Sequence, residues 1–239
     1  RAYRKVTDRP FVVNAHVGFL DEVRCRALAE AGCRILKFGL ESGSPRIRDR
    51  ILNRRMTNDA IAEAVAMVHR FGMHSSAFVM IGLPDETADD LRQTIDLLAR
   101  TMPGRFRWTF FYPFPGTRAH QLAVEGGWVD FERMERLANF TDGSCLDFGG
   151  EGDLLLEKVG RILPWLVNAA SRLPAAPDYR RRVEGLLAMG RQEWEAVRPD
   201  LHNEDRRLSA ELQQAGSLHY AVRYNPFMGV RSDCFLDAL

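Results

Sequence analysis

Short apolar runs alternate with longer amphipathic ones along the first two thirds of this 239-residue chain. The apolar runs predict strands at residues 11–15, 35–40, 76–81 and 107–111, and each is followed by a turn and a helical stretch. Strands that alternate with helices pair in parallel, because each helix crosses back over the sheet before the next strand begins. The sequence therefore predicts an α/β fold with four strand-loop-helix units.

Several predicted helices have recognisable ends. Gly32 is expected to end the helix over residues 20–31, since glycine readily adopts the left-handed backbone conformation found after a helix. Thr57 or Asn58 is expected to cap the helix over residues 60–71. These boundaries support the division into strand-helix units.

Four such units are half of an eight-unit barrel or two thirds of a six-unit one, and an open doubly wound sheet is a further possibility. The pattern favours a partial barrel of the TIM type. In both architectures ligands bind at the carboxyl ends of the strands. The loops expected to bind a ligand are therefore residues 41–44, 82–87 and 112–117, with 14–18 as a further candidate.

The strand-helix alternation stops at about residue 150. Helices are predicted over residues 154–170, 179–197 and 203–215, with proline-containing breaks between them. We therefore expect two parts, a barrel portion over residues 1–130 and a mainly helical C-terminal extension over residues 131–239. The apolar tail near residues 224–229 is expected to dock on the main domain.

The charges and apolar lengths restrict the partners. Lys and Arg number 33 against 32 Asp and Glu, so nothing predicts binding to nucleic acid or to an acidic membrane. The apolar stretches are far shorter than the roughly 20 residues of a membrane-spanning helix, and no signal peptide is evident. We expect a cytoplasmic protein with a small-molecule partner.

No metal site is predicted from the sequence. Cys25, Cys33, Cys145 and Cys234 are scattered, and none has the spacing of metal ligands. His16 follows the first predicted strand, but no second histidine or carboxylate stands at a suitable spacing from it.

Glu41 and Ser42 follow the second predicted strand. A carboxylate beside a hydroxyl suits a ribose diol, and the neighbouring Gly43 allows close approach to the backbone. The alternative interpretation is that Glu41 and Ser42 cap the helix that begins near Pro45. Both interpretations remain open from the sequence.

Two further loops carry candidate binding residues. Gly82, Leu83 and Pro84 form a turn whose exposed amides could contact an adenine edge, although a plain strand-to-helix turn is the alternative. Tyr112 and Pro113 begin a stiff aromatic and proline-rich segment that suits stacking, and the alternative there is simple loop packing.

The motifs resemble those of a known family when they are taken in order. The segments FGLESGS, ILNRRMT, VMIGLPDET, FFYPFPGT and AVEGGW, over residues 11–130, resemble the second half of the radical S-adenosylmethionine (SAM) barrel. The resemblance is to the cobalamin-binding, or B12-type, radical SAM proteins. It implies the last four units of a (β/α)6 barrel.

The resemblance also implies a chemistry. In this family three cysteines after the first strand bind a 4Fe-4S cluster, which cleaves SAM to a radical that modifies a substrate, for example by methyl transfer. Glu41 and Ser42 then match the region near the ribose and methionine moieties, Gly82 to Pro84 match the adenine contact, and Tyr112 and Pro113 match the last-strand wall. Cobalamin is a further possible cofactor.

This chain departs from the family in several ways. The cluster cysteines and the first two strands are missing, Asp85 replaces a usual glycine, and Gly18 stands where arginine is common. We therefore expect a fragment that is inactive alone and whose partner is a missing N-terminal part. The alternative is a cluster-less binding or partner module; a lyase or aldolase would need a better placed lysine than Lys37.

Overall fold

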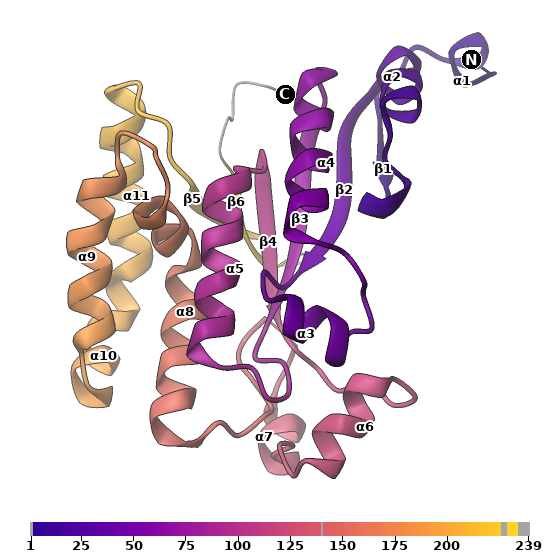
Figure 1. The fold of residues 1–239 in the computed structure, drawn as a ribbon. Coiled ribbons are helices and arrows are strands. Elements are labelled where there is room, and N and C mark those ends of the chain that lie inside the picture. Colours follow the sequence, from indigo (N-terminus) through magenta and orange to yellow (C-terminus); the bar gives the residue numbers. More distant parts are fainter. Residues whose placement is uncertain (1, 140, 226–228, 234–239) are drawn as a thin grey trace.

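The computed structural model describes residues 2–139, 141–225 and 229–233. Its centre is a sheet with the strand order β1-β2-β3-β4-β6-β5 (Figure 1). The first four strands are parallel, which confirms the predicted α/β fold. The strands are β1 (Phe11–Asn14), β2 (Cys33–Glu41), β3 (His74–Ile81), β4 (Arg105–Phe110), β5 (Ala221–Asn225) and β6 (Gly229–Asp233).

The helices begin and end at sequence signals of the expected kind. Thr57 caps α4 by accepting a hydrogen bond from the amide of Ala60 at 3.0 Å, and Gly32 ends α2 with a φ of +94°. The helices are α1 (Ala2–Val6), α2 (Glu22–Ala31), α3 (Pro45–Arg50), α4 (Asn58–Arg70), α5 (Ala88–Thr101), α6 (Arg118–Glu125), α7 (Phe131–Arg136), α8 (Gly149–Ala170), α9 (Ala176–Ala188), α10 (Arg191–Val197) and α11 (Leu201–Gln214), with 3-10 turns η1 (Val17–Phe19) and η2 (Arg198–Asp200).

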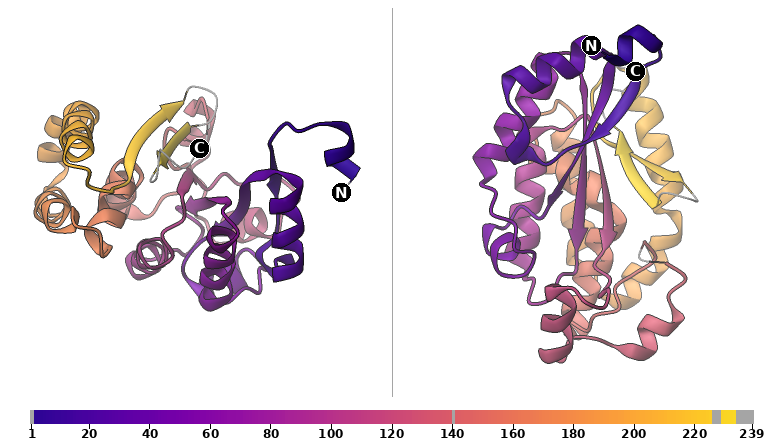
Figure 2. Two further views of the ribbon diagram at one scale, coloured as in Figure 1. Left: turned by 90° about the horizontal axis from the view of Figure 1, so that it is seen from above. Right: turned by 90° about the vertical axis from the view of Figure 1, so that its right-hand side faces the viewer.

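Helices cover one face of the parallel sheet. Figure 2 shows α4 and α5 on one side of the strands, and no helix of the described residues lies across the opposite side. Alternate residues of β2, namely Leu36, Phe38 and Leu40, are fully buried in the main hydrophobic core toward the helices. The residues between them, such as Lys37 and Gly39, therefore lie on the other face, which we call the open face.

The C-terminal extension is mainly helical, as predicted, and it differs from the prediction in two places. The expected helix over 179–197 is two helices, because the chain turns at Met189 and Gly190 between α9 and α10. The tail forms the antiparallel hairpin β5–β6, whose second strand pairs with β4 and so extends the sheet. Residues 226–228, which were expected to dock with the rest of the tail, lie outside the described residues.

Buried polar groups attach the extension to the sheet. Asp205 of α11 accepts a hydrogen bond from Trp165 Nε1 of α8 at 2.7 Å and another from the amide of Val222 in β5 at 3.1 Å. Asn168 of α8 bonds to both backbone groups of Tyr220, just before β5. Because these groups are paired inside the core, they fix the position of α8 relative to α11 and the hairpin.

No helix among the described residues is both long and apolar enough to cross a lipid bilayer.

The open edge of β1 gives a testable prediction. Among the described strands β1 pairs only with β2, so its other edge is exposed, and Val12 there is 49% exposed. An unpaired edge strand pairs readily with another chain, so we expect this chain to self-associate. Val12→Lys should shift it toward monomer in sedimentation velocity.

The matched control for this edge prediction is Val23→Lys on α2. Val23 is 77% exposed and lies away from the strand edge, so this variant should associate like the wild type. A monomeric wild-type chain, or equal behaviour of the two variants, would contradict the prediction.

Candidate functional site

The loops that follow β2, β3 and β4 meet at the carboxyl end of the sheet, near α3 and α6 in Figure 1. Arg46 of α3 forms ion pairs with both Asp85 and Asp90, which belong to the loop after β3 and to α5. Asp90 also accepts a hydrogen bond from Ser44 Oγ at 2.6 Å. Burial would raise the pKa of Asp90, but hydrogen bonds from Arg46, Ser44 and Thr87 outweigh it and hold that pKa well below its usual range.

Glu41 occupies a strained position at the end of β2. Its φ is +65°, a backbone conformation that costs energy for a residue with a side chain. The carboxylate turns back over Gly39, where a Cβ would lie only 2.0 Å from Glu41 Oε1. Arg54 Nη2 lies 3.2 Å from the same oxygen, so a carboxylate and a guanidinium stand together on the open face.

The neighbouring strands continue this polar surface. Gly39 pairs in register with Phe78 of β3, which in turn pairs with Arg107 of β4. The guanidinium of Arg107 lies 5.8 Å from the centre of the Phe78 ring, within the range of a cation-π contact. Burial raises the pKa of Glu41, and the positive charge of Arg54 only partly offsets this effect. The open face thus combines a poorly solvated carboxyl group, arginines and an aromatic ring.

Ser42 lies away from this surface. Its side chain is fully buried, 3.3 Å from Thr94 Oγ1 of α5, and its Oγ accepts a hydrogen bond from the amide of Ser44. Gly43 packs so closely on α5 that a Cβ would lie 2.2 Å from the carbonyl oxygen of Gln93. The alternative that Glu41 and Ser42 cap the helix that begins at Pro45 is wrong, because the cap is Ser44, which accepts from the amide of Ile47. Ser42 therefore anchors the loop, while Glu41 faces the open side.

Arg48 is fully buried and holds the loop after β2 by hydrogen bonds. Arg48 donates to the carbonyl oxygens of Ser42 and Met56 and to Asn58 Oδ1. The segment between α3 and α4 carries Arg54, so Arg48 fixes the base of the segment that presents it. Burial lowers the pKa of Arg48.

We predict that Arg48→Met lowers the free energy of unfolding by about 2 to 4 kcal/mol, because buried carbonyl groups lose their donor. Arg50→Met on the same helix is the control, since Arg50 is exposed and should change stability by less than about 0.5 kcal/mol. Urea denaturation measures both. Equal stability of the two variants would contradict the role assigned to Arg48.

Gly82, Leu83 and Pro84 are buried. The expectation of exposed amides is wrong for Gly82 and Leu83, because both donate to Glu86 Oε2, at 2.6 and 3.3 Å. The space beside Gly82 is filled by Leu156 of α8, which a Cβ would approach to 2.8 Å. The sequence reasoning missed Glu86, although a carboxylate shortly after a glycine turn is a common way to satisfy loop amides.

Tyr112 and Pro113 follow β4 at the same end of the sheet. Pro113 is buried and Tyr112 is partly exposed, with its ring 5.0 Å from that of the exposed Phe114. A role of this segment in stacking on a ligand stays a prediction. Of the predicted binding residues, Tyr112 is partly exposed and Glu41 is buried beside Arg54, while Ser42, Pro113 and the three loop residues after β3 are buried beneath.

Glu86 gives a prediction about pH. Burial raises its pKa to about 8, and the hydrogen bonds from Gly82 and Leu83 only partly offset this. A group whose pKa is raised on folding stabilises the folded state fully below its unfolded pKa, near 4.5. This stability is lost as the pH rises through about 8.

Glu86→Gln should flatten that dependence, since the amide keeps an oxygen for the two loop amides and does not ionise. The measurement is urea unfolding at several values between pH 5 and pH 8.5, with the two proteins compared at each. An unchanged slope in the variant would show that Glu86 does not titrate as described.

The described residues contain no group of three or more His, Cys, Asp or Glu side chains that could hold a metal ion. Cys25 and Cys33 are buried in the main core, Cys145 is buried in a second apolar cluster, and Cys234 lies outside the described residues. An iron-sulfur cluster therefore has no evident ligand set in this part of the chain.

One family model matches part of the chain. Residues 1–98, which include β1 to β3 and the Glu41–Arg54 pair, match the sequence model of the Radical SAM superfamily. The match ends inside α5, so the C-terminal extension lies outside it.

One curated protein similar to part of this chain is an uncharacterized methyltransferase of Pyrococcus horikoshii. The two are 31% identical over 117 residues, which are 49% of this chain and 25% of the relative. The chain thus spans about a quarter of that protein's length.

Solved radical SAM proteins are also similar in part. Coproporphyrinogen III oxidase of Escherichia coli has a TM-score of 0.44 and 17% identity, over 48% of this chain and 27% of that one. The methyltransferase TsrM of Kitasatospora setae, solved with cobalamin and a [4Fe-4S] cluster, has a TM-score of 0.43 and 17% identity, over 54% and 24%. Elp3 of Methanocaldococcus infernus has a TM-score of 0.48 and 12% identity, over 64% and 32%.

Proposed function

We propose that this chain is the SAM-binding part of a radical SAM enzyme and that SAM binds on the open face at the carboxyl ends of β2 to β4. The observation that carries the proposal is the Glu41–Arg54 pair on the open face, within the segment that matches the family. Parallel α/β sheets bind their ligands at this end.

The residues present fit SAM in charge and shape. Arg54 would donate hydrogen bonds to the methionine carboxylate, and Glu41 would accept them from the ammonium group or the ribose hydroxyls. Phe78 and Arg107, further along the face, offer an apolar and a cationic contact. Ser42 and the Gly82–Pro84 turn hold the backbone in place beneath these groups.

The 4Fe-4S cluster, unlike SAM, is not matched by the residues present. The described residues do not supply its cysteine ligands, so we derive no step through it for this chain. Bound SAM supplies a sulfonium group that a reduced cluster elsewhere in a longer protein could cleave. The contribution of this chain is to bind and orient SAM, and to hold Glu41 with little solvent around it.

The overall reaction and the use of cobalamin are properties of a longer protein of which this chain would be a part. The partial likeness to a curated methyltransferase supports methyl transfer as the reaction of the longer enzyme, with cobalamin as a further cofactor. A cluster-less module that binds SAM without cleaving it is the alternative. The two differ in whether the longer protein forms 5′-deoxyadenosine from SAM under anaerobic, reducing conditions.

We predict that Glu41→Gln and Arg54→Met each weaken SAM binding about tenfold, because each removes one charge-assisted hydrogen bond. Isothermal titration calorimetry with the chain as it stands measures this. The matched control is Arg55→Met, since Arg55 adjoins Arg54 in sequence but its side chain is 86% exposed and lies 4.0 Å from Asp49.

The control and the site variants have different expected affinities for SAM. Arg55→Met should bind SAM like the wild type, and circular dichroism should show that all three variants fold. If the wild type shows no saturable SAM binding, or if Arg55→Met loses as much affinity as Arg54→Met, the proposed site is wrong.

A further inference from the structure

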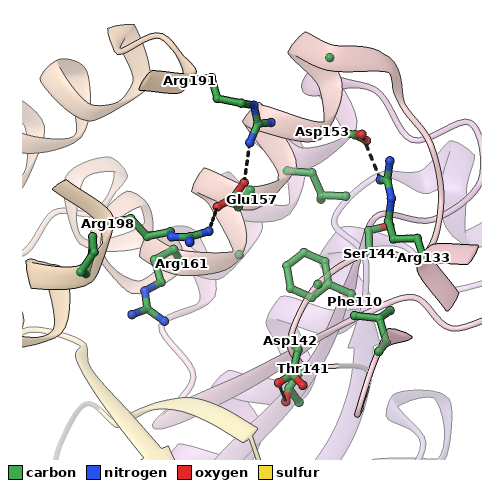
Figure 3. Close-up of a pocket in the computed structure, with 16 residues that line it drawn as sticks. Phe110, Arg133, Thr141, Asp142, Ser144, Asp153, Glu157, Arg161, Arg191 and Arg198 are labelled. Carbon is green, nitrogen blue, oxygen red and sulfur yellow. Dashed lines mark hydrogen bonds and ion pairs between the residues drawn. The ribbon is translucent and has the colours of Figure 1, made fainter. Parts of the chain in front are cut away.

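A cavity of about 940 Å³ opens beside α8 at the end of β4. Phe110 and Leu156 form part of its apolar wall, and Figure 3 shows charged side chains on both sides of them. Its size is that of a site for an ordinary small organic molecule. The family match ends before any of its lining residues, so the cavity is a feature of the region after residue 98.

Basic groups outnumber acidic ones around this cavity. Among its described lining residues there are four arginines and three acidic residues. On one side Arg191 and Arg198 both bond to Glu157, whose other partner is Trp194 Nε1 at 3.0 Å. Glu157 thus bridges two guanidinium groups on this wall (Figure 3), and the exposed Glu195 lies 3.8 Å from Arg191 Nη1.

Glu157 is held ionised there. Burial would raise the pKa of Glu157, but hydrogen bonds from Trp194, Arg198 and Arg191 outweigh it and lower that pKa. Glu157 meets the Nη1 atom of each arginine, and a guanidinium carries five N–H donors. An incoming oxyanion can therefore bond to the same two arginines without removing Glu157.

The opposite wall is fixed in a similar way. Arg133 of α7 pairs with Asp130 and with Asp153, at 3.1 and 3.0 Å, and it also donates to the carbonyl oxygen of Leu146. This arginine is balanced by two carboxylates, so it shapes the cavity. The side of Arg191 and Arg198 offers guanidinium N–H groups to a ligand, with Arg161 also on the lining.

The cavity lies on the other side of the sheet from the open face. The Phe110 ring points to α8, where a Cβ on Gly160 would lie 2.3 Å from Phe110 Cζ. Arg107, three residues earlier in β4, contacts Phe78 on the open face instead. A ligand in this cavity would therefore be separated by the sheet from SAM on the open face.

We propose that this cavity binds a small organic oxyanion, a carboxylate or a phosphate ester with an apolar body. Arg191 and Arg198 bind the oxyanion, and the apolar body packs on Phe110 and Leu156. The proposal does not depend on the SAM site, because it involves different residues and a different face.

The test uses three probes, inorganic phosphate, benzoate and phenyl phosphate, at constant ionic strength set with sodium chloride. The fluorescence of Trp194, which contacts Glu157, reports binding, and calorimetry gives the affinity. Phenyl phosphate should bind more tightly than inorganic phosphate, because its ring packs on the apolar wall. Comparison of benzoate with phenyl phosphate distinguishes a carboxylate site from a phosphate site.

Two variants are expected to change the affinity for phenyl phosphate in opposite directions. Arg198→Gln should weaken phenyl phosphate binding about tenfold, because a charge-assisted hydrogen bond is lost. Glu157→Gln should tighten binding severalfold, because the carboxylate that competes for both arginines becomes neutral. A purely structural ion-pair network predicts no binding in either variant.

The control is Arg181→Gln on α9, whose side chain is 77% exposed and pairs with Asp178 outside the cavity. It should bind phenyl phosphate like the wild type. Lack of saturable binding by the wild type and by Glu157→Gln, or equal loss in Arg181→Gln and Arg198→Gln, would overturn the proposal. Loss of SAM binding alone would leave it standing.

Discussion

The packing of one face of the parallel sheet against α4, α5 and α8 is the interaction on which the rest of this structure depends. Leu36, Phe38 and Leu40 alternate with Lys37 and Gly39 along β2, so burial of one set directs the other to the open face. The parallel order follows from the helical crossovers, and it brings the ends of all four strands to one edge. The candidate SAM site exists because these two consequences coincide at Glu41.

Buried polar side chains with hydrogen-bond partners then hold that edge in place. Asp90 joins the loops after β2 and β3, Arg48 supports the segment that carries Arg54, and Glu86 satisfies the turn after β3. Each of these groups is buried and hydrogen-bonded, and such groups are costly to break because their partners would remain in a poorly solvated place. The strained φ of Glu41 is tolerated because its surroundings are fixed in this way.

The extension gives the protein a second face for chemistry. Helix α8 packs beside α5 and covers the end of β4, and α10 with η2 then closes a cavity on the helical side. Arg191 and Arg198 share Glu157 there, while Arg54 pairs with Glu41 on the open face. Arginine-carboxylate pairs thus occur on both sides of the sheet, and in the cavity two arginines share Glu157.

The sequence by itself determined the α/β class, the four parallel units, the ends of α2 and α4, and the resemblance to the radical SAM family. These features depend on local periodicity and on residues close together in the chain, so they can be read without the fold. It also named Glu41 and Ser42 as candidate binding residues, and it could not separate the two, because adjacent residues carry the same local signal.

Only the tertiary structure decided which of these polar residues lie on the open face and which are buried beneath it. Arg54 and Arg55 are adjacent in sequence, yet Arg54 alone pairs with Glu41, and Ser42 is buried against Thr94, 52 residues away. The hairpin β5–β6 and the pairing of Glu157 with Arg191 and Arg198 are likewise contacts between distant segments. Such contacts are fixed by the packing of whole helices and strands, and no local pattern in the sequence encodes them.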